Sequence, residues 1–381
     1  MSEPGADGRF GALDSVRGLA SLTVVVDHCL NVFPLFGGPS ADQITPQPGS
    51  ALTFLLRSPL SLAWNGRGAV ALFFVLSGFV LALPWFRGRP PSWRRFILRR
   101  FCRVYLPYAA AVALAMALAA CLASPHPPRL SAWFDANWDE PVTWAVVVDH
   151  LLMLGAHNTF DNAVWSLNHE MRISLLFPLL LLPVLRFGLP GAVVTAAALF
   201  GFAGMITHFA GRHGAPAEMA ATIRFSMFFV FGAALARSAD RLRAASPGHA
   251  AWLSLITGSF CLWYTTEPAG QAIGSTLIIL AGIFPGRIQN TLLSPSLRAL
   301  GRISYSLYLI HLLVLLSAVH LLIGHAPLPA IVAGAFAASL PVAVVFYRWI
   351  EAPSDQLGRR LVRRLDMQRT RSTAATADDA R

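Results

Sequence analysis

Long apolar runs recur along the whole chain and constrain its fold more than any other feature. They are 17–25 residues long, and a helix of this length spans roughly 30 Å of hydrocarbon at about 1.5 Å per residue. Only helices and closed barrels satisfy their backbone groups in lipid, and these runs lack the alternation that barrel strands require. The sequence therefore predicts an all-α, polytopic integral membrane helical bundle.

We predict about ten transmembrane helices in this bundle. Their approximate ranges are 13–34, 68–86, 104–123, 164–186, 189–210, 221–237, 250–265, 269–286, 303–324 and 328–350. Charged residues make up only 13% of the 381 residues, against about 25% in an average soluble protein. No polar linker divides the series, so residues 11–352 form one predicted transmembrane domain, flanked by an N-terminal cytoplasmic segment at 1–10 and a basic tail at 353–381.

The arginines predict the orientation of the bundle, because cytoplasmic loops carry an excess of basic residues. All 30 basic residues are Arg, with seven at 87–103, three each at 237–249 and 287–302, and seven after residue 352. The connections on the other side carry Arg57, Arg67, Arg129 and Arg212. We therefore place both termini in the cytoplasm.

Three stretches outside these spans need their own interpretation. The outward segments 35–67 and 124–163 contain Pro, Gly and Trp, and they form either a roof over an outward-facing cavity or chain packed at the lipid headgroups. Within the second, 141–156 is apolar but short, which predicts an interfacial or re-entrant helix. The tail from Asp366 is rich in Ala, Thr and charge, and we predict that it is disordered.

The formal charge of +11 could indicate a nucleic-acid partner. The arginines lie in short loops between apolar runs, however, and no basic and aromatic recognition module accompanies them. We therefore expect membrane lipids around the protein and no nucleic acid. The four cysteines form no CxxC pair, which favours small packing residues over a disulfide or a metal site.

The first span carries the densest set of ionisable and polar groups. Arg17 and His28 are eleven residues apart, which is three helical turns plus about 20°, so they share one face. Asp14, Ser21 and Asn31 fall within about 60° of the same line. Ionisable residues inside a span are costly and face the bundle interior. The stripe is either a functional track or a hydrogen-bond ladder between helices, and we favour the track.

Two further groups of polar residues lie in the third and fourth spans. Ser166, Glu170 and Ser174 repeat every four residues and so share a helical face. Glu170 could orient or deprotonate a histidine on a neighbouring helix. Arg100 and Arg103 share a face at the cytoplasmic mouth of the third span, where their guanidinium groups either mark topology or bind phosphate.

The last two spans add a third set of polar side chains. Tyr308 and His311 lie together inside the ninth span, and such groups within a bundle indicate function by default. Glu351 closes the tenth span beside Pro353, where an interfacial cap explains it as well as chemistry does.

Taken together, these motifs resemble the acyltransferase-3 family of membrane-bound acyltransferases, which includes bacterial enzymes that acetylate surface glycans. The resemblance covers about residues 10–352, and the motifs stand in family order. They are LDSVRGLASLTVVVDH at 13–28, FFVLSGFVL at 73–81, the pair Arg100 and Arg103, WSLNHE at 165–170 and ISYSLYLIH at 303–311. One departure is that Met171 and Ser174 stand where many relatives carry a second acid and a Tyr.

The resemblance implies an O-acyltransferase of the inner (cytoplasmic) membrane. It would move an acyl group, usually acetyl, from cytoplasmic acyl-CoA to a hydroxyl of a carbohydrate-containing acceptor, such as a cell-surface polysaccharide or glycolipid. Acyl-CoA is then a co-substrate, and no permanently bound cofactor is expected. The resemblance also implies that Arg17 and His28 are essential, and that Arg100 and Arg103 engage the acyl-CoA.

We expect His28 to be the general base that removes the acceptor proton, with Glu170 orienting its imidazole. Arg17 would stabilise the oxyanion or hold the donor, and a covalent acyl-His intermediate is a further route. The supporting residues of this expected site are Asp14, Ser166, Tyr308 and His311.

Two other function classes fit part of the pattern. Intramembrane Arg, His and Glu also suit a proton-coupled transporter or exporter of a hydrophilic or lipid-linked substrate. In that scheme, the arginine pair at the cytoplasmic mouth has less purpose, and the two halves of the chain show no clear repeat. A structural scaffold, whose polar stripes specify helix packing, is the third class.

Overall fold

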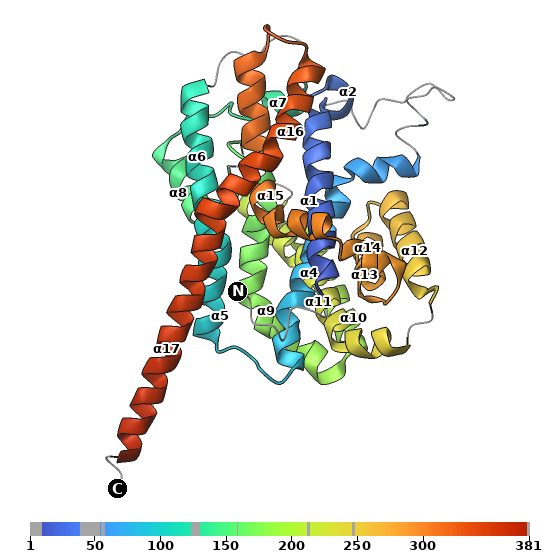
Figure 1. Ribbon diagram of the computed structural model, residues 1–381, viewed down its shortest axis with the longest axis vertical. Coiled ribbons are helices and arrows are strands. Elements are labelled where there is room, and N and C mark those ends of the chain that lie inside the picture. The colour runs from blue at the N-terminus through green and yellow to red at the C-terminus, as the bar shows by residue number, and fades with distance from the viewer. Residues whose placement is uncertain are drawn as a thin grey trace.

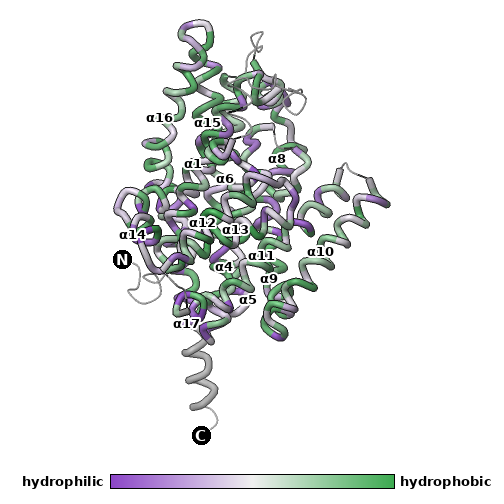
Figure 2. The backbone as a smooth tube through the Cα atoms, turned by 90° about the vertical axis from the view of Figure 1, so that its right-hand side faces the viewer, coloured by the Kyte–Doolittle hydropathy of each residue, from purple (hydrophilic) through white to green (hydrophobic). Residues whose placement is uncertain are grey.

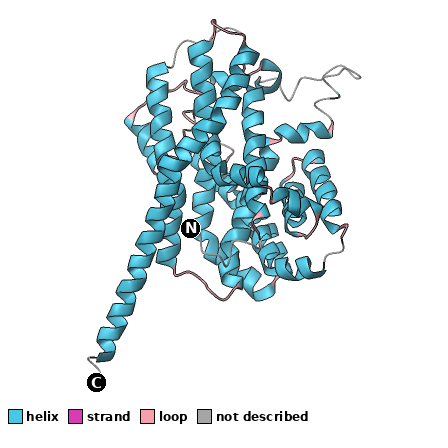
Figure 3. Ribbon diagram, viewed as in Figure 1, coloured by secondary structure: helices cyan, strands magenta, loops and turns pink. Residues whose placement is uncertain are grey.

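The computed structural model describes residues 10–38, 54, 58–122, 130–157, 159–211, 214–245 and 248–378. Throughout these residues the chain is helical or in short connections, and it forms no β-strand (Figure 3). The all-α class is therefore confirmed. Most of the N-terminal segment 1–10, parts of both long outward segments, and Arg57, Arg129 and Arg212 lie outside the described residues.

The long helices form an upright bundle (Figure 1). They are α1 (Ala12–Asn31), α4 (Gly66–Phe86), α5 (Trp93–Arg100), α6 (Leu106–Leu122), α9 (Trp165–Phe187), α10 (Leu189–Ala210), α11 (Gly214–Ala245), α12 (Ala250–Tyr264), α13 (Pro268–Ile283), α15 (Pro295–Leu322), α16 (Leu328–Phe346) and α17 (Ala352–Asp378). Shorter helical pieces connect them: α2 (Pro34–Gly37), η1 (Pro59–Trp64), η2 (Phe101–Tyr105), α7 (Ala132–Asp135), α8 (Trp144–Leu151), η3 (Asn162–Val164), α14 (Arg287–Leu292) and η4 (Tyr347–Glu351).

Among the described residues, six helices are long and apolar enough to cross a membrane. They are Gly66–Phe86, Trp93–Leu122, Leu189–Ala210, Gly214–Ala244, Pro295–Leu322 and Leu328–Met367. Each of the ten predicted spans coincides with a helix, but α12 and α13 are shorter, at 15 and 16 residues. The first and fourth spans, α1 and α9, carry the ionisable residues that lower their hydropathy. The count of about ten spans stays a prediction.

The exposed surface of the bundle is suited to lipid. Helix α10 packs on α9 and α11 and exposes large apolar side chains, among them Val194, Phe202 and Phe209. Figure 2 shows this helix coloured mainly hydrophobic at the edge of the bundle. A contiguous apolar face of this kind is rare on a soluble monomer. The protein is therefore a multi-pass membrane protein.

Glycines let two helix pairs approach closely at the centre of the bundle. Where α4 crosses α11, a Cβ on Gly78 would lie 2.2 Å from Phe229 O, and one on Gly232 would lie 2.0 Å from Val75 O. Small residues at such crossings allow backbones to meet in membrane proteins. Helices α1 and α15 meet in the same way, because a Cβ on Gly18 would lie 2.8 Å from the backbone N of Gly301.

The C-terminal helix leaves the bundle as a long projection (Figure 1). Its side chains contact α5 near the bundle, where Arg95 and Asp366 form an ion pair of 2.5 Å. The helical backbone continues to Asp378, although we predicted disorder from Asp366. Ala and Arg are strong helix formers, so this segment extends the preceding helix.

Candidate active site

The interface between α1 and α15 positions both residues of the predicted polar stripe. Arg17 donates from Nε to Ser304 Oγ at 2.9 Å and from Nη2 to the Gly301 carbonyl at 3.4 Å. Two helical turns further along α15, His311 Nε2 lies 2.9 Å from His28 Nδ1. Arg17 and His28 therefore face the same neighbouring helix inside the bundle, as their spacing predicted.

The two histidines form a buried pair. His28 is 8% exposed and His311 is 1% exposed, and their ring centroids are 5.0 Å apart with planes inclined by 20°. His311 Nδ1 also lies 2.9 Å from the Leu307 carbonyl oxygen. The pair is thus held by α1 on one side and by the backbone of α15 on the other.

The segment around α7 covers the histidine pair at one end. The Trp133 ring lies 5.1 Å from the His28 ring. Ser131 fixes this segment on the last turn of α1, because its N–H donates to the Val32 carbonyl and its hydroxyl donates to the Asn31 carbonyl. This part of the segment 124–163 thus packs over His28 at one end of the pair.

A cavity of about 410 Å³ opens on the other side of the site, between α1, α4, α9 and α15. Three exposed arginines line its mouth: Arg89, Arg99 and Arg103. Its polar lining further in includes Arg17 and Ser304. The cavity therefore combines a cationic entrance with a polar interior, which suits an elongated anionic substrate.

Tyr308 forms a wall between this cavity and the histidine pair. It lines the cavity, and its ring centroid lies 6.1 Å from that of His311. The Tyr308 hydroxyl donates to the Ala163 carbonyl at 2.8 Å and accepts from the Ser166 hydroxyl at 2.7 Å. Tyr308 and Ser166, two expected supporting residues, thus meet here.

Glu170 pairs with an arginine and not with a histidine. Its Oε1 accepts from Arg100 Nη2 at 2.8 Å and from Ser77 Oγ at 3.0 Å. The side chains of Arg100 and Glu170 are only 13% and 16% exposed, and Arg100 also donates to Ser174. The expected contact of Glu170 with His28 does not occur in the described part of the chain, where the imidazole partner is His311.

Two arginines of the cavity were not singled out from the sequence, and Glu351 was left there between an interfacial cap and a chemical role. Arg89 and Arg99 belong to an arginine cluster that we interpreted as a topology signal. Glu351 lines the cavity from the π-helix η4, with Oε2 accepting from the Ser306 N–H at 3.1 Å and from its hydroxyl. A π-helix has no sequence signature, yet such turns are frequent at functional sites; η2, which carries Arg103, is a second one.

Other ionisable groups lie around the cavity, on the helices that form it. Asp14 lies at the exposed edge, 3.5 Å from Arg17. Arg172 joins α9 to α11 by donating to Thr222 Oγ1 at 3.1 Å, and it donates to the Met153 carbonyl at 2.7 Å. Among the residues that the structure describes, no group of three or more His, Cys, Asp or Glu could hold a metal ion.

Asp161, in the connection before α9, is a buried carboxyl near this wall. Its Oδ1 accepts from the Ala163 N–H at 3.2 Å, and its Oδ2 has no hydrogen-bond partner within the described chain. Burial raises the pKa of Asp161 to about 8, and the Ala163 N–H opposes this only in part. The carboxyl therefore holds its proton at neutral pH.

Fold and site together define a multi-pass membrane protein that encloses a cation-lined cavity next to a buried histidine pair. Residues 10–348 match the family of the acyltransferase domain, acyltransferase-3. Because this match covers nearly the whole chain, the protein belongs to that family. The enzyme class is therefore favoured over the transporter and the scaffold.

One curated relative supports the same class. Over 171 residues the chain is 31% identical to acyltransferase MdmB of Streptomyces mycarofaciens. The match covers 45% of this chain and 39% of that protein, so the chain spans well under half of the relative's length. No solved structure matches significantly.

Proposed function

We propose that this membrane acyltransferase transfers an acyl group, acetyl in the simplest case, from acyl-CoA to a hydroxyl of a carbohydrate-containing acceptor, such as a surface polysaccharide or glycolipid. The observation that carries the proposal is the cavity, which has three arginines at its mouth and reaches to within one helical turn of the histidine pair. An acyl-CoA has a matching shape, with charged phosphates at one end and a thioester at the other.

The donor phosphates bind to the exposed arginines in this scheme. Arg89, Arg99 and Arg103 line the mouth, and guanidinium groups bind phosphate by paired N–H donors. Arg100 has another role, because its charge is already neutralised by Glu170. The pair fixes α5 to α9 and shapes the cavity wall, while Arg103 keeps the phosphate role expected for it.

The chemistry takes place at the inner end of the cavity. The acceptor hydroxyl gives its proton to His28 as its oxygen attacks the thioester carbonyl carbon. Arg17, whose contacts on α15 lie two helical turns from the histidine pair, holds the donor in the cavity. The C–S bond then breaks, and the CoA thiolate takes the proton from His28 and leaves as the thiol. General-base work of this kind contributes about 10²–10⁴-fold to a rate. Tyr308 must move aside for the thioester to reach His28.

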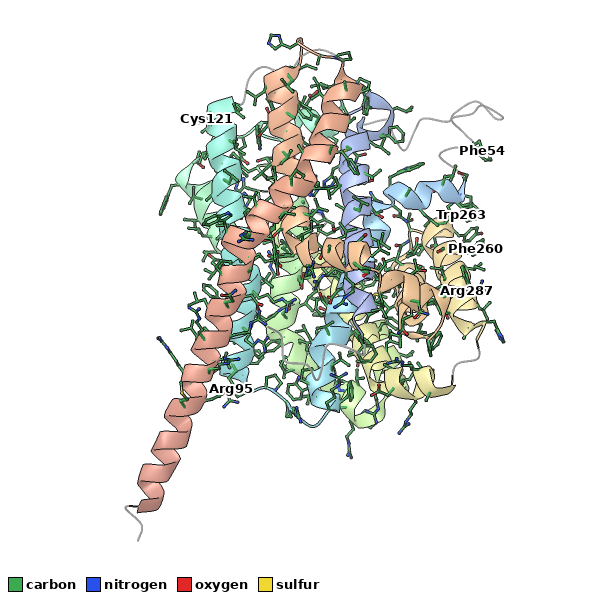
Figure 4. The ribbon with its side chains drawn as sticks, viewed as in Figure 1. Phe54, Arg95, Cys121, Phe260, Trp263 and Arg287 are labelled. Carbon is green, nitrogen blue, oxygen red and sulfur yellow. The ribbon has the colours of Figure 1, made fainter. Side chains whose placement is uncertain are left out.

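The same scheme orients the protein in the inner membrane, with about ten spans and both termini in the cytoplasm. Figure 4 places Arg95 at the end of the bundle where α17 emerges and Cys121 at the opposite end. The arginine-rich segment that includes Arg95 leads into the cavity mouth. A cytoplasmic position for this end therefore agrees with the arginine distribution and with a cytoplasmic donor.

The proposal is tested with purified protein in liposomes, radiolabelled acetyl-CoA and surface glycans as acceptors. We expect acceptor-dependent release of CoA and label on the glycan. Arg99→Gln and Arg103→Gln should each raise KM for acetyl-CoA by about 10-fold, the loss expected for one charge-assisted phosphate contact. Arg241→Gln, on α11 and outside the cavity lining, is the matched control.

Two results would contradict the proposal. The first is wild-type protein that neither releases CoA nor labels any glycan fraction. The second is a KM that rises equally in Arg103→Gln and in the Arg241→Gln control, because the mouth of the cavity would then have no specific role in donor binding.

A further inference from the structure

The geometry of the histidine pair determines which nitrogens face each other. The N–N distance is 2.9 Å while the ring centroids are 5.0 Å apart and the planes are inclined by only 20°. The two nitrogens therefore lie close to the line between the ring centres, and the rings meet edge to edge. A proton on one nitrogen then points at the lone pair of the other.

The backbone of α15 decides which nitrogen carries that proton. His311 Nδ1 lies 2.9 Å from the Leu307 carbonyl oxygen, and a carbonyl oxygen can only accept. His311 Nδ1 therefore carries a hydrogen, because the alternative would bring two lone pairs together. A neutral imidazole with hydrogen on Nδ1 has a bare Nε2, and this is the atom that faces His28.

The proton between the rings must then belong to His28. A proton on both nitrogens of His311 would make it a cation, yet neither imidazole contacts a carboxylate in the described part of the chain. Burying a charge without a partner is costly. His28 thus donates from Nδ1 to His311 Nε2, and this leaves His28 Nε2 as an unprotonated nitrogen.

We infer that His311 is the positioning residue that holds His28 in the tautomer with a bare Nε2, and that this nitrogen is the base in the acyl transfer. The inference rests on the proposed function and assigns a role that the cavity alone does not. When His28 takes the acceptor proton on Nε2, both of its nitrogens carry hydrogen. His311 Nε2 accepts from the resulting imidazolium and stabilises its charge, as a carboxylate does in other catalytic sites.

Two substitutions at His311 separate this role from simple packing. His311→Leu removes the acceptor, so we expect kcat to fall by about 10²-fold with KM for acetyl-CoA unchanged. His311→Gln keeps an acceptor oxygen near the position of Nε2 and should retain kcat within about 10-fold of wild type. His325→Leu, the same change at an exposed histidine just beyond the same helix, should leave kcat unchanged.

A spectroscopic measurement reports the tautomer of His28 independently of any assay of enzyme activity. Protein with ¹⁵N-labelled histidine rings is studied by solid-state NMR in lipid at neutral pH, and the His28 signals are assigned by their loss in His28→Gln. We expect hydrogen on Nδ1 and a bare Nε2 in the wild type. In His311→Leu, the hydrogen should move partly or wholly to Nε2, the form that isolated imidazole side chains prefer.

Three outcomes are distinguishable. Wild-type spectra with hydrogen on His28 Nε2 would overturn the inference, even if His311→Leu failed to fold. Equal rates for His311→Leu and wild type would overturn it as well. If the wild type transferred no acyl group but showed the expected tautomer, the proposed function would fail while the assignment of the histidine pair stood.

Discussion

At the scale of single residues, Glu170 and Arg100 illustrate how a partner changes the role of a charged group. Glu170 was expected to orient the catalytic imidazole, but its carboxylate is held by Arg100 and Ser77. Within a membrane bundle, an ion pair of this kind stabilises the fold by keeping both charges compensated. The two residues should therefore act as one unit in any measurement of stability.

A double-mutant cycle tests this unit. We expect Arg100→Ala and Glu170→Ala each to destabilise the protein, because each leaves a poorly exposed charge without its partner. The double variant should lose less than the sum of the two, with a coupling free energy of about 1–3 kcal/mol. Thermal unfolding in detergent measures all four proteins, and additive losses would show that the pair contributes nothing.

The buried carboxyl of Asp161 predicts how the stability of the protein changes with pH. The folded carboxyl has a pKa of about 8, against 3.8 as its ordinary value. Between these values the folded state binds more protons than the unfolded state, so stability falls as pH rises from about 4 to 8. Asp161→Asn cannot titrate, and we expect its Tm to fall less than that of the wild type between pH 5 and pH 8. If Tm fell by the same amount in Asp161→Asn as in the wild type, groups other than Asp161 would cause the loss of stability.

At the scale of elements, the crossing of α4 and α11 depends on glycine. Gly232→Ala would place a Cβ 2.0 Å from the Val75 carbonyl oxygen, so the helices would have to separate. We expect a loss of about 1–3 kcal/mol, the usual cost of overpacking. Gly204→Ala on α10 is the matched control, because nothing lies within 4 Å of its added Cβ. Comparable Tm values for both variants would contradict the role of the crossing.

The elements were largely predictable, while their partners were not. Apolar runs of sufficient length gave the positions of the helices, because lipid leaves the backbone few alternatives. The face shared by Arg17 and His28 followed from helical periodicity alone. The pairing of His28 with His311 and of Arg100 with Glu170 depends on how distant helices pack, which a single sequence does not specify. The π-helices that bring Arg103 and Glu351 into the cavity are likewise set by tertiary packing.

At the scale of the whole molecule, the proposed topology can be tested with a native cysteine. Cys121 is exposed at the end of the bundle opposite α17, while Cys29 and Cys102 are buried. We expect a membrane-impermeant maleimide to label Cys121 from outside the inner membrane of spheroplasts. A Met367→Cys variant, tested in a Cys121→Ser background, should be labelled only after the membrane is opened.

The reverse pattern of labelling would show that the protein has the opposite orientation in the membrane. The donor cavity would then open to the outside, where acyl-CoA is not available, and the proposed direction of transfer would fail with it. Labelling of both cysteines in intact spheroplasts would place both on the outside and would therefore indicate an even number of spans between them.

The enclosure of His28 has a consequence for how the enzyme uses its donor. Trp133 covers the imidazole from one end, and Tyr308 separates it from the cavity on the other. Water is the competing nucleophile for every thioester, and its access to an activated base is what turns a transferase into a thioesterase. A base shielded on both sides restricts this side reaction, so donor left without an acceptor should persist, and opening either aromatic cover should convert productive turnover into futile hydrolysis.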